Sequence, residues 1–355
     1  MNDLALIFAL ASVATGLVLH VLPDRPARWF SMIAAAAALA VWAPLALLWL
    51  LALIAATWAA MRGGETRGHR DLPVALVTAA ALAALLGLRE LPGIVWLGGA
   101  YFTLRNLHVL FDWWRGRGVA PTLADLARYN LFLPVLVAGP IHRFPEFQRE
   151  WRRRRPGVED LAAGAERVLM GLASCVVLAT RFDDIAREPL RVIEVPSFMA
   201  RWLLSACDWV YLFFVFAGLS AVAIGSARMA GLKIEENFDH PWRARDLAGF
   251  WLRWHMSLSF WVRDYVYQPV AVAMRSPVAG VAAAMLAMGL WHETSLHYVL
   301  WAVWQAAGIV VSHLVLRRGP PLPRRIGGIV SPVLILGWLS LAGPVLALAL
   351  GGGAP

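Results

Sequence analysis

The sequence is poor in charged residues and cysteines, and it lacks the short motifs of the common soluble enzymes. Only 15% of its 355 residues are charged, against about 25% in an ordinary soluble domain, and 60% are hydrophobic. The two cysteines, Cys175 and Cys207, lie in apolar segments, where we expect small core residues and no disulfide or metal framework. No G-x-S-x-G, P-loop or G-x-G-x-x-G pattern is present, so a serine hydrolase or a nucleotide-binding enzyme has no support.

Long apolar runs are what the chain has instead. A helix needs about 20 apolar residues to cross a bilayer, because every backbone group must be satisfied within the helix. The clearest runs are 3–22, 29–61, 74–88, 198–230 and 329–350. Pro44 should break the second run into two helices or a sharply kinked pair. With the less apolar segments included, we predict an all-α, multi-pass membrane protein with roughly nine to eleven transmembrane or half-membrane helices.

The placement of the basic residues also indicates a membrane. The formal net charge of +9 could suggest nucleic acid, but the arginines cluster in short connections: "RGGETRGHRD", "WWRGRG", "EWRRRRPG" and "RRGPPLPRR". This is the positive-inside pattern, so we expect these connections to face the cytoplasm, and we expect membrane lipids but no nucleic acid as partners. Arg152 to Arg155 are candidates to contact anionic lipid headgroups, although a solvated topology signal is the favoured interpretation. The first 26 residues lack a basic start and a small-residue cleavage site, which favours an uncleaved first span. We expect residues 1–355 to form a single membrane-embedded domain.

Polar side chains within apolar sequence are candidates for function, because an ionisable group in a membrane is costly. One such segment is "NFDHPWRARDLAGFWLRWHMSLSFWVRDYVYQPV", residues 237–270. Its aromatic residues recur at spacings of three and four. This predicts one short amphipathic helix, entered through Pro241, in the interface or beside a water-filled cavity. His255 and Ser259 lie on the face next to the aromatic stripe, and His255 taken alone fits a hydrogen-bonded packing histidine better than a catalyst.

The second segment is "GLWHETSLHYVLW", residues 289–301. A zinc protease requires H-E-x-x-H, which brings both imidazoles to one face of a helix. Here the second histidine comes one residue too late, and five helical positions turn by about 140 degrees, so the rings of His292 and His297 should point apart. We therefore predict no metal site. We expect His292 to be a buried neutral imidazole, which can act as a general base.

Several ordered motifs resemble one protein family. "FWLRWHMSLSFWVRDYVY" followed by "MGLWHETSLHYVLW", with His292 37 residues after His255, is similar to the membrane-bound O-acyltransferase family, and most of all to its bacterial alginate O-acetyltransferases and teichoic-acid D-alanyl transferases. Further segments resemble the family in the same order: "LGGAYFTLRNLHVLFDWWRG", "NLFLPVLVAGPIHRF" and "FVFAGLSAVAIG" with "NFDHPW". The resemblance covers about residues 95–316, between N-terminal helices in 1–94 and a last helix in 327–350.

The resemblance implies helices around a central tunnel, short interfacial helices and an O-acyl transfer inside the tunnel. His292 matches the family's catalytic histidine and would take the proton of an acceptor hydroxyl. His255 matches its second histidine and would orient His292 or donate a hydrogen bond to the developing oxyanion. The expected tunnel-lining or assisting residues are Glu293, Ser257, Ser259, Arg253, Trp291, Trp254, Asn237 and Tyr298.

The same resemblance implies the substrates and the location. The donor would be acyl-CoA or an acyl-carrier-protein thioester, with no bound cofactor. The acceptor would be an extracytoplasmic glycan, or a partner acyltransferase that completes the transfer, at the bacterial inner membrane. Two alternatives stay open: a lipid or small-molecule acyltransferase of the same fold and, from another class, a transporter, channel or inactive scaffold.

The sequence departs from the family pattern in several places. Glu293 stands where the family commonly has glycine after its histidine, and this adds an ionisable group that would tune His292 or shape the pocket. Other replaced positions are Val215, Leu219, Ala221, Ala173 and Ser174. These differences concern the substrate more than the reaction. Arg263 and Asp264 are expected to form a structural pair on the predicted amphipathic helix.

Overall fold

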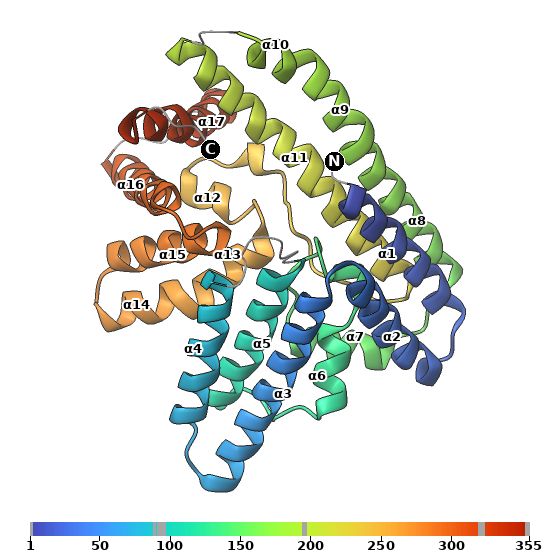
Figure 1. The fold of residues 1–355 in the computed structure, drawn as a ribbon. Helices are drawn as coiled ribbons and strands as arrows, with labels where there is room; N and C mark the ends of the chain where they lie inside the picture. Colours follow the sequence, from blue (N-terminus) through green and yellow to red (C-terminus); the bar gives the residue numbers. More distant parts are fainter. Residues whose placement is uncertain (1–2, 88–89, 91–96, 194–196, 319–323, 352–355) are drawn as a thin grey trace. The chain divides into compact units, whose positions relative to one another are not determined.

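The structure is a computed structural model, and it describes residues 3–87, 90, 97–193, 197–318 and 324–351. All regular structure in these residues is helical, as predicted (Figure 1). The chain divides into two compact units, the first made of Met1–Gly171 and Leu219–Glu235 and the second of Leu172–Gly218 and Glu236–Pro355. Helix α11 (Phe198–Met229) contains a boundary between them. The expectation of one domain stays a prediction.

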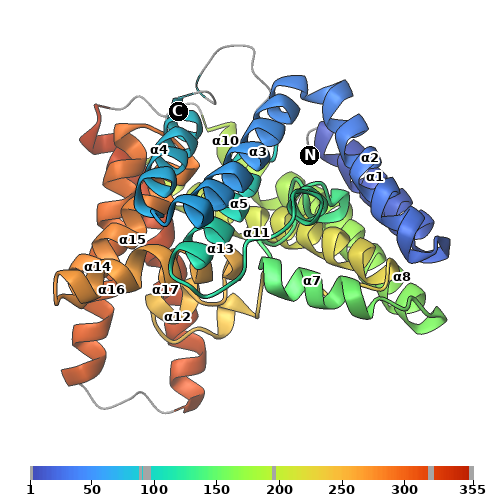
Figure 2. The same cartoon turned by 90° about the horizontal axis from the view of Figure 1, so that it is seen from below.

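The first unit contains the N-terminal helices and the end of α11. These helices are α1 (Asp3–Val21), α2 (Asp24–Trp42), α3 (Pro44–Arg67), α4 (Asp71–Gly87), α5 (Gly99–Trp114), α6 (Leu123–Asn130), α7 (Phe144–Arg153) and α8 (Val158–Leu172). Within this unit α1 packs on α2, and α3, α4 and α5 pack on one another (Figures 1 and 2). The break predicted at Pro44 is confirmed: Pro44 begins α3, because proline is tolerated in the first turn of a helix.

Two glycines allow close helix packing in this unit. A Cβ atom built on Gly164 of α8 would lie 2.6 Å from the carbonyl oxygen of Gly225 in α11, and one built on Gly225 would lie 2.7 Å from the carbonyl oxygen of Gly164. A side chain at either position would therefore push the two helices apart. Contacts between small residues are typical of helices that associate within a membrane.

The second unit contains the first part of α11 and the C-terminal helices. After α8, wide π-type turns at Ala173–Leu178 and Asp183–Arg187 continue the helix through α9 (Ala179–Phe182) to α10 (Glu188–Arg191). The remaining helices are α12 (Leu247–Trp251), α13 (Met256–Val262), α14 (Gln268–Ala273), α15 (Pro277–His292), α16 (Leu296–Arg318) and α17 (Arg324–Ala349). Figures 1 and 2 show α14, α15 and α16 side by side, with α15 packed on both neighbours.

Five helices in the described part of the chain are long and apolar enough to cross a membrane. They are Leu4–Val21, Pro44–Arg67, Val158–Arg191, Phe198–Met229 and Gly327–Ala349, while Asp71–Gly87 and Pro277–His292 are apolar but shorter. Each apolar run named from the sequence corresponds to helix, although residue 88 lies outside the described residues. The total of nine to eleven membrane helices and the central tunnel stay predictions. The arginine-rich connection 317–325 lies in part outside the described residues.

Candidate active site

The predicted helix across residues 237–270 is wrong, because the chain breaks at His255. Pro241 opens a short 3₁₀ turn, and α12 begins only at Leu247, where the side chain of Asp246 accepts a hydrogen bond from the Gly249 amide at 2.6 Å. His255 has φ of 45°, a left-handed conformation that few residues other than glycine adopt. Helix α13 starts at the next residue, so His255 sits in a tight turn between two short helices.

Asn237 holds this turn from outside the two helices. Its backbone carbonyl accepts a hydrogen bond from the Met256 amide at 2.9 Å. Its side-chain oxygen accepts from the Ser257 hydroxyl at 2.8 Å and from the Ser257 amide at 3.3 Å. Asn237 is fully buried. Asn237 and Ser257, expected to assist the reaction or line the tunnel, are joined by these hydrogen bonds, which fix the backbone directly after His255.

The structure brings the two predicted histidines to one cavity of about 190 Å³ in the second unit. The cavity is lined by Trp209, Leu212, Phe216, Trp251, Trp254, His255, Leu258, Ser259, Met288, His292, Tyr298 and Trp301. Five residues named from the sequence are among them, and the Ser259 hydroxyl donates to the carbonyl oxygen of Trp254 at 3.2 Å. The cavity is therefore mostly aromatic, and its lining residues include two histidines and two residues with hydroxyl groups, Ser259 and Tyr298.

Aromatic rings position both histidines. The ring of His255 lies 4.7 Å from Phe216, edge to face, and 5.6 Å from Trp291. The ring of His292 lies 4.9 Å from Trp291 and stacks on Tyr298 with a centroid distance of 5.6 Å and an angle of 18°. Trp291 thus contacts both imidazoles, and Tyr298 supports the outer face of His292. Packing of this kind limits the rotation of the two rings.

The two histidines differ in exposure. His255 is 4% exposed, and burial, with a smaller contribution from nearby His292, lowers its pKa to about 3. It is therefore neutral at pH 7, with one N–H to donate. His292 is exposed, so the expectation of a buried imidazole is wrong. His292 is the last residue of α15, and the chain leaves the helix in an extended conformation at Glu293, which uncovers the ring.

Other predicted residues lie away from the cavity lining. The Arg253 guanidinium pairs with the Asp239 carboxylate and donates to the Asp239 carbonyl oxygen, so it holds a surface turn. Glu293 is exposed, and its side chain forms no hydrogen bond or ion pair with other residues in the part of the chain that the structure describes. The ring of His297 packs edge to face on Tyr298. The predicted pair of Arg263 and Asp264 is confirmed at 2.7 Å.

Several lining residues were missed in the sequence. Trp209, Leu212 and Phe216 come from α11, and Met288 and Trp301 come from α15 and α16. The three α11 residues recur at spacings of three and four, so they share one helix face, and this pattern was visible in the sequence. Among the described residues, no group of three or more histidine, cysteine, aspartate or glutamate side chains is placed to hold a metal ion.

A second buried polar cluster lies in the first unit, where the segments 97–116 and 130–144 meet. The Phe144 amide donates to Nε2 of His108 at 3.1 Å, so the ring proton is on Nδ1, which lies 3.4 Å from the Tyr129 hydroxyl. That hydroxyl donates to the carbonyl oxygen of His142. The Arg105 guanidinium donates to the carbonyl oxygens of Val135 and of Pro140, the latter at 3.4 Å.

An asparagine pair completes this cluster. The Asn106 amide donates to the Asn130 side-chain oxygen at 2.8 Å, and the Asn130 amide donates back at 3.3 Å. Arg105, Asn106, His108, Tyr129 and Asn130 have no exposed surface. The two motifs that resembled the same family in the sequence are thus joined by hydrogen bonds inside one unit. We interpret the cluster as structural, because its hydrogen bonds hold the two segments together.

Comparison with known proteins finds relatives of the kind that both sets of motifs resembled in the sequence. The chain is 28% identical to the "Probable alginate O-acetylase" of Pseudomonas aeruginosa, over 68% of this chain and 48% of that protein. It is 29% identical to the teichoic acid D-alanyltransferase of Streptococcus thermophilus, over 62% of this chain and 58% of that protein. It is 26% identical to the peptidoglycan O-acetyltransferase of Helicobacter pylori, over 53% of this chain and 37% of that protein.

The chain thus spans about half the length of the curated relatives it matches. The sequence matches one protein family over residues 96–325. This range contains His255 and His292, the cavity that they line, and the segments 97–116 and 130–144 that form the buried polar cluster. The family resemblance predicted from the sequence is confirmed, and the chain belongs to the membrane-bound O-acyltransferase family.

Proposed function

We propose that this protein is a multi-pass membrane O-acyltransferase that moves an acyl group from a thioester donor to a hydroxyl acceptor, with His292 as the general base. The observation that carries the proposal is the single cavity shared by His255 and His292, which lie 37 residues apart in the sequence. Membership of an acyltransferase family and the names of the relatives support the reaction class.

The reaction follows from the different states of the two imidazoles. His292 is exposed to the cavity, so an acceptor hydroxyl can reach its ring. As the acceptor oxygen bonds to the thioester carbonyl carbon, its proton passes to His292. The tetrahedral intermediate then collapses, the carbon–sulfur bond breaks, and the leaving thiolate takes the proton. His255, which is neutral, donates a hydrogen bond to the oxyanion in the intermediate.

The acceptor and partners are proposed from the relatives alone. The names of three relatives refer to alginate, teichoic acid and peptidoglycan, so we propose a glycan acceptor outside the cytoplasm at a bacterial inner membrane. The donor is acyl-CoA or an acyl carrier protein, and a second acyltransferase on the outer side is the expected partner where the glycan is not acylated directly.

The test is a transfer assay with the purified full chain. It would be incubated with acyl-CoA and acyl-carrier thioesters and glycan acceptors, and the products identified by mass spectrometry. His292→Ala should abolish product formation, while His297→Ala, a matched change five residues away outside the cavity, should leave it intact. Undiminished thioester consumption by His292→Ala would overturn the assignment of the base.

A further inference from the structure

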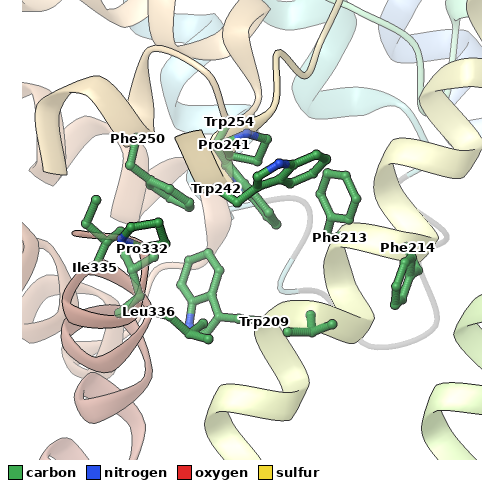
Figure 3. Close-up of a pocket in the computed structure, with 12 residues that line it drawn as sticks. Trp209, Phe213, Phe214, Pro241, Trp242, Phe250, Trp254, Pro332, Ile335 and Leu336 are labelled. Atoms are coloured by element: carbon green, nitrogen blue, oxygen red, sulfur yellow. The ribbon is translucent and has the colours of Figure 1, made fainter. Parts of the chain in front are cut away.

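A second cavity of about 350 Å³ lies beside the candidate active site (Figure 3). Side chains from α11, including Trp209 and Phe213, face Leu336 and its neighbours on α17, while Trp242 and Phe250 close the space between them. None of its twelve lining residues is charged, and all but the tryptophan N–H groups are apolar. The volume lies within the range of about 300 to 1,000 Å³ that is usual for small-molecule sites.

This aromatic cavity shares a wall with the histidine cavity. Trp209 and Trp254 line both, and Trp254 directly precedes His255 in the chain. A chain held in the aromatic cavity would therefore begin at the edge of the space where His255 and His292 meet the substrate. The tail of a lipid-linked acceptor is separated from its reacting hydroxyl by a head group, whereas the alkyl chain of an acyl group is bonded directly to the reacting carbonyl carbon.

We propose that the aromatic cavity holds the alkyl chain of the transferred acyl group, so that the preferred donor carries a medium-length fatty acyl chain. This inference rests on the proposed function. A cavity of about 150 Å³ holds the six carbons of benzene, so by proportion 350 Å³ accommodates an alkyl chain of up to roughly fourteen carbons. An acetyl group leaves this space unused, and the ammonium group of a D-alanyl donor would lose its hydration among the aromatic side chains.

A third cavity, of about 590 Å³, also adjoins the histidine cavity through Trp251, Ser259 and Met288. Its walls carry the guanidinium of Arg263, the phenol of Tyr267 and the imidazole of His313. These groups suit a ligand with polar atoms along its length. We assign the alkyl chain to the aromatic cavity because that lining offers an alkyl chain dispersion contacts without displacing water from a charged group.

The experiment fills each cavity in the full-length protein and compares donors. Acetyl-CoA and octanoyl-CoA would be assayed with the same saturating acceptor for the wild type and for Leu336→Trp, which places an indole in the aromatic cavity. Leu334→Trp is the matched control, because Leu334 is 65% exposed and lies outside the cavity on the same helix. Val281→Trp fills the third cavity.

The wild type should prefer octanoyl to acetyl, since each buried methylene is worth about fourfold in binding. Leu336→Trp should lower kcat/KM for octanoyl more than about tenfold and change the acetyl value less than about twofold, and Leu334→Trp should change neither. Equal loss for both donors, or a selective octanoyl loss in Val281→Trp instead, would overturn the assignment. If the wild type transfers acetyl groups only, the assignment of the alkyl chain to the aromatic cavity is overturned, and the proposed acyl-transfer function still holds. If the wild type transfers no acyl group from any donor, the result contradicts the proposed function itself.

Discussion

His108 and His142 in the first unit and His255 in the second are all buried, yet their surroundings differ in one respect. Around His108, the partners are backbone groups and neighbouring polar side chains, which form a closed chain from Phe144 to Tyr129. Around His255, aromatic rings surround the imidazole, and one side of it lines a cavity that also receives the exposed His292. In both regions the histidines are buried polar side chains. In the second region the histidine also lines a cavity.

This comparison shows why a buried histidine in apolar sequence is an incomplete signal of catalysis. Burying an ionisable group in a membrane protein costs free energy wherever the group lies. Hydrogen bonds can offset this cost, so the group can be retained for structure as well as for function. In the first unit the hydrogen bonds join two segments of the chain. In the second unit, hydrogen bonds from Ser257 to Asn237 fix the backbone directly after His255, and the His255 ring lines the cavity.

The largest effect should come from removing one buried histidine in each region. His255→Ala should lower kcat about 100- to 1,000-fold, as expected for the loss of one oxyanion donor, with little change in melting temperature. His108→Ala should do the reverse: the Phe144 amide loses its acceptor, which costs about 2 to 3 kcal/mol of stability, while kcat per folded molecule is retained.

Activity assays and thermal melts of both variants in the same detergent would measure these effects. If His108→Ala lowered kcat as strongly as His255→Ala at the same concentration of folded protein, the structural role of the first cluster would be contradicted. If His255→Ala were mainly a stability variant, the imidazole would be a packing residue, which was the simpler interpretation of this histidine in isolation.

The next effect concerns the buried asparagine of each region. Asn237→Leu removes the acceptor of the Ser257 hydroxyl and amide and loosens the left-handed turn at His255, so kcat should fall about tenfold with KM nearly unchanged. Asn237→Asp keeps the accepting oxygen and should recover part of kcat. Asn130→Leu, the matched change in the first unit, leaves Asn106 without its partner and should lower stability alone.

Steady-state kinetics would separate these roles, because a merely structural asparagine lowers the amount of active protein and leaves kcat per folded molecule unchanged. Asn237→Leu with wild-type kcat at matched folded concentration would contradict its role in positioning His255. A loss of kcat in Asn130→Leu would contradict the structural role of the first cluster.

The helices were predictable from the sequence where apolar runs determine them. The spans 3–22 and 198–230 match α1 and α11 closely, and Pro44 divides the run 29–61, because length in the bilayer and the geometry of proline are local properties. The break at His255 was missed, since the aromatic spacing of three and four continues across it. The turn depends on Asn237, which is 18 residues earlier in the chain and contributes nothing to that periodicity.

The pairing of His255 with His292 was predicted from family motifs, and the spacing alone could not show it, because the 36 residues between them include α13, α14 and most of α15. The roles of Arg253 and Glu293 were also beyond the sequence. Whether a charged side chain faces a cavity or a surface turn depends on partners such as Asp239, which are set by the tertiary structure.

The smallest predicted effect is a dependence of stability on pH, which both regions should show. Burial lowers the pKa of His255 to about 3 and lowers the pKa of His142 well below its usual value, with Arg105 adding to the effect at His142. Below pH about 6.5 the unfolded chain binds a proton at each position and the folded chain does not, so stability is present above that pH and declines as pH falls toward the folded pKa. Each histidine should contribute up to about 1.4 kcal/mol of lost stability per pH unit.

Melting temperatures between pH 7.5 and about pH 4.5 would measure this slope for the wild type, His255→Gln and His142→Gln. Each variant should flatten the slope by a similar amount, because glutamine does not titrate, yet only His255→Gln should also lower transfer at pH 7. An unchanged slope in His255→Gln would mean that this imidazole is hydrated and open to protonation in the folded protein. It would then be positively charged at mildly acidic pH, and transfer would depend on pH through His255.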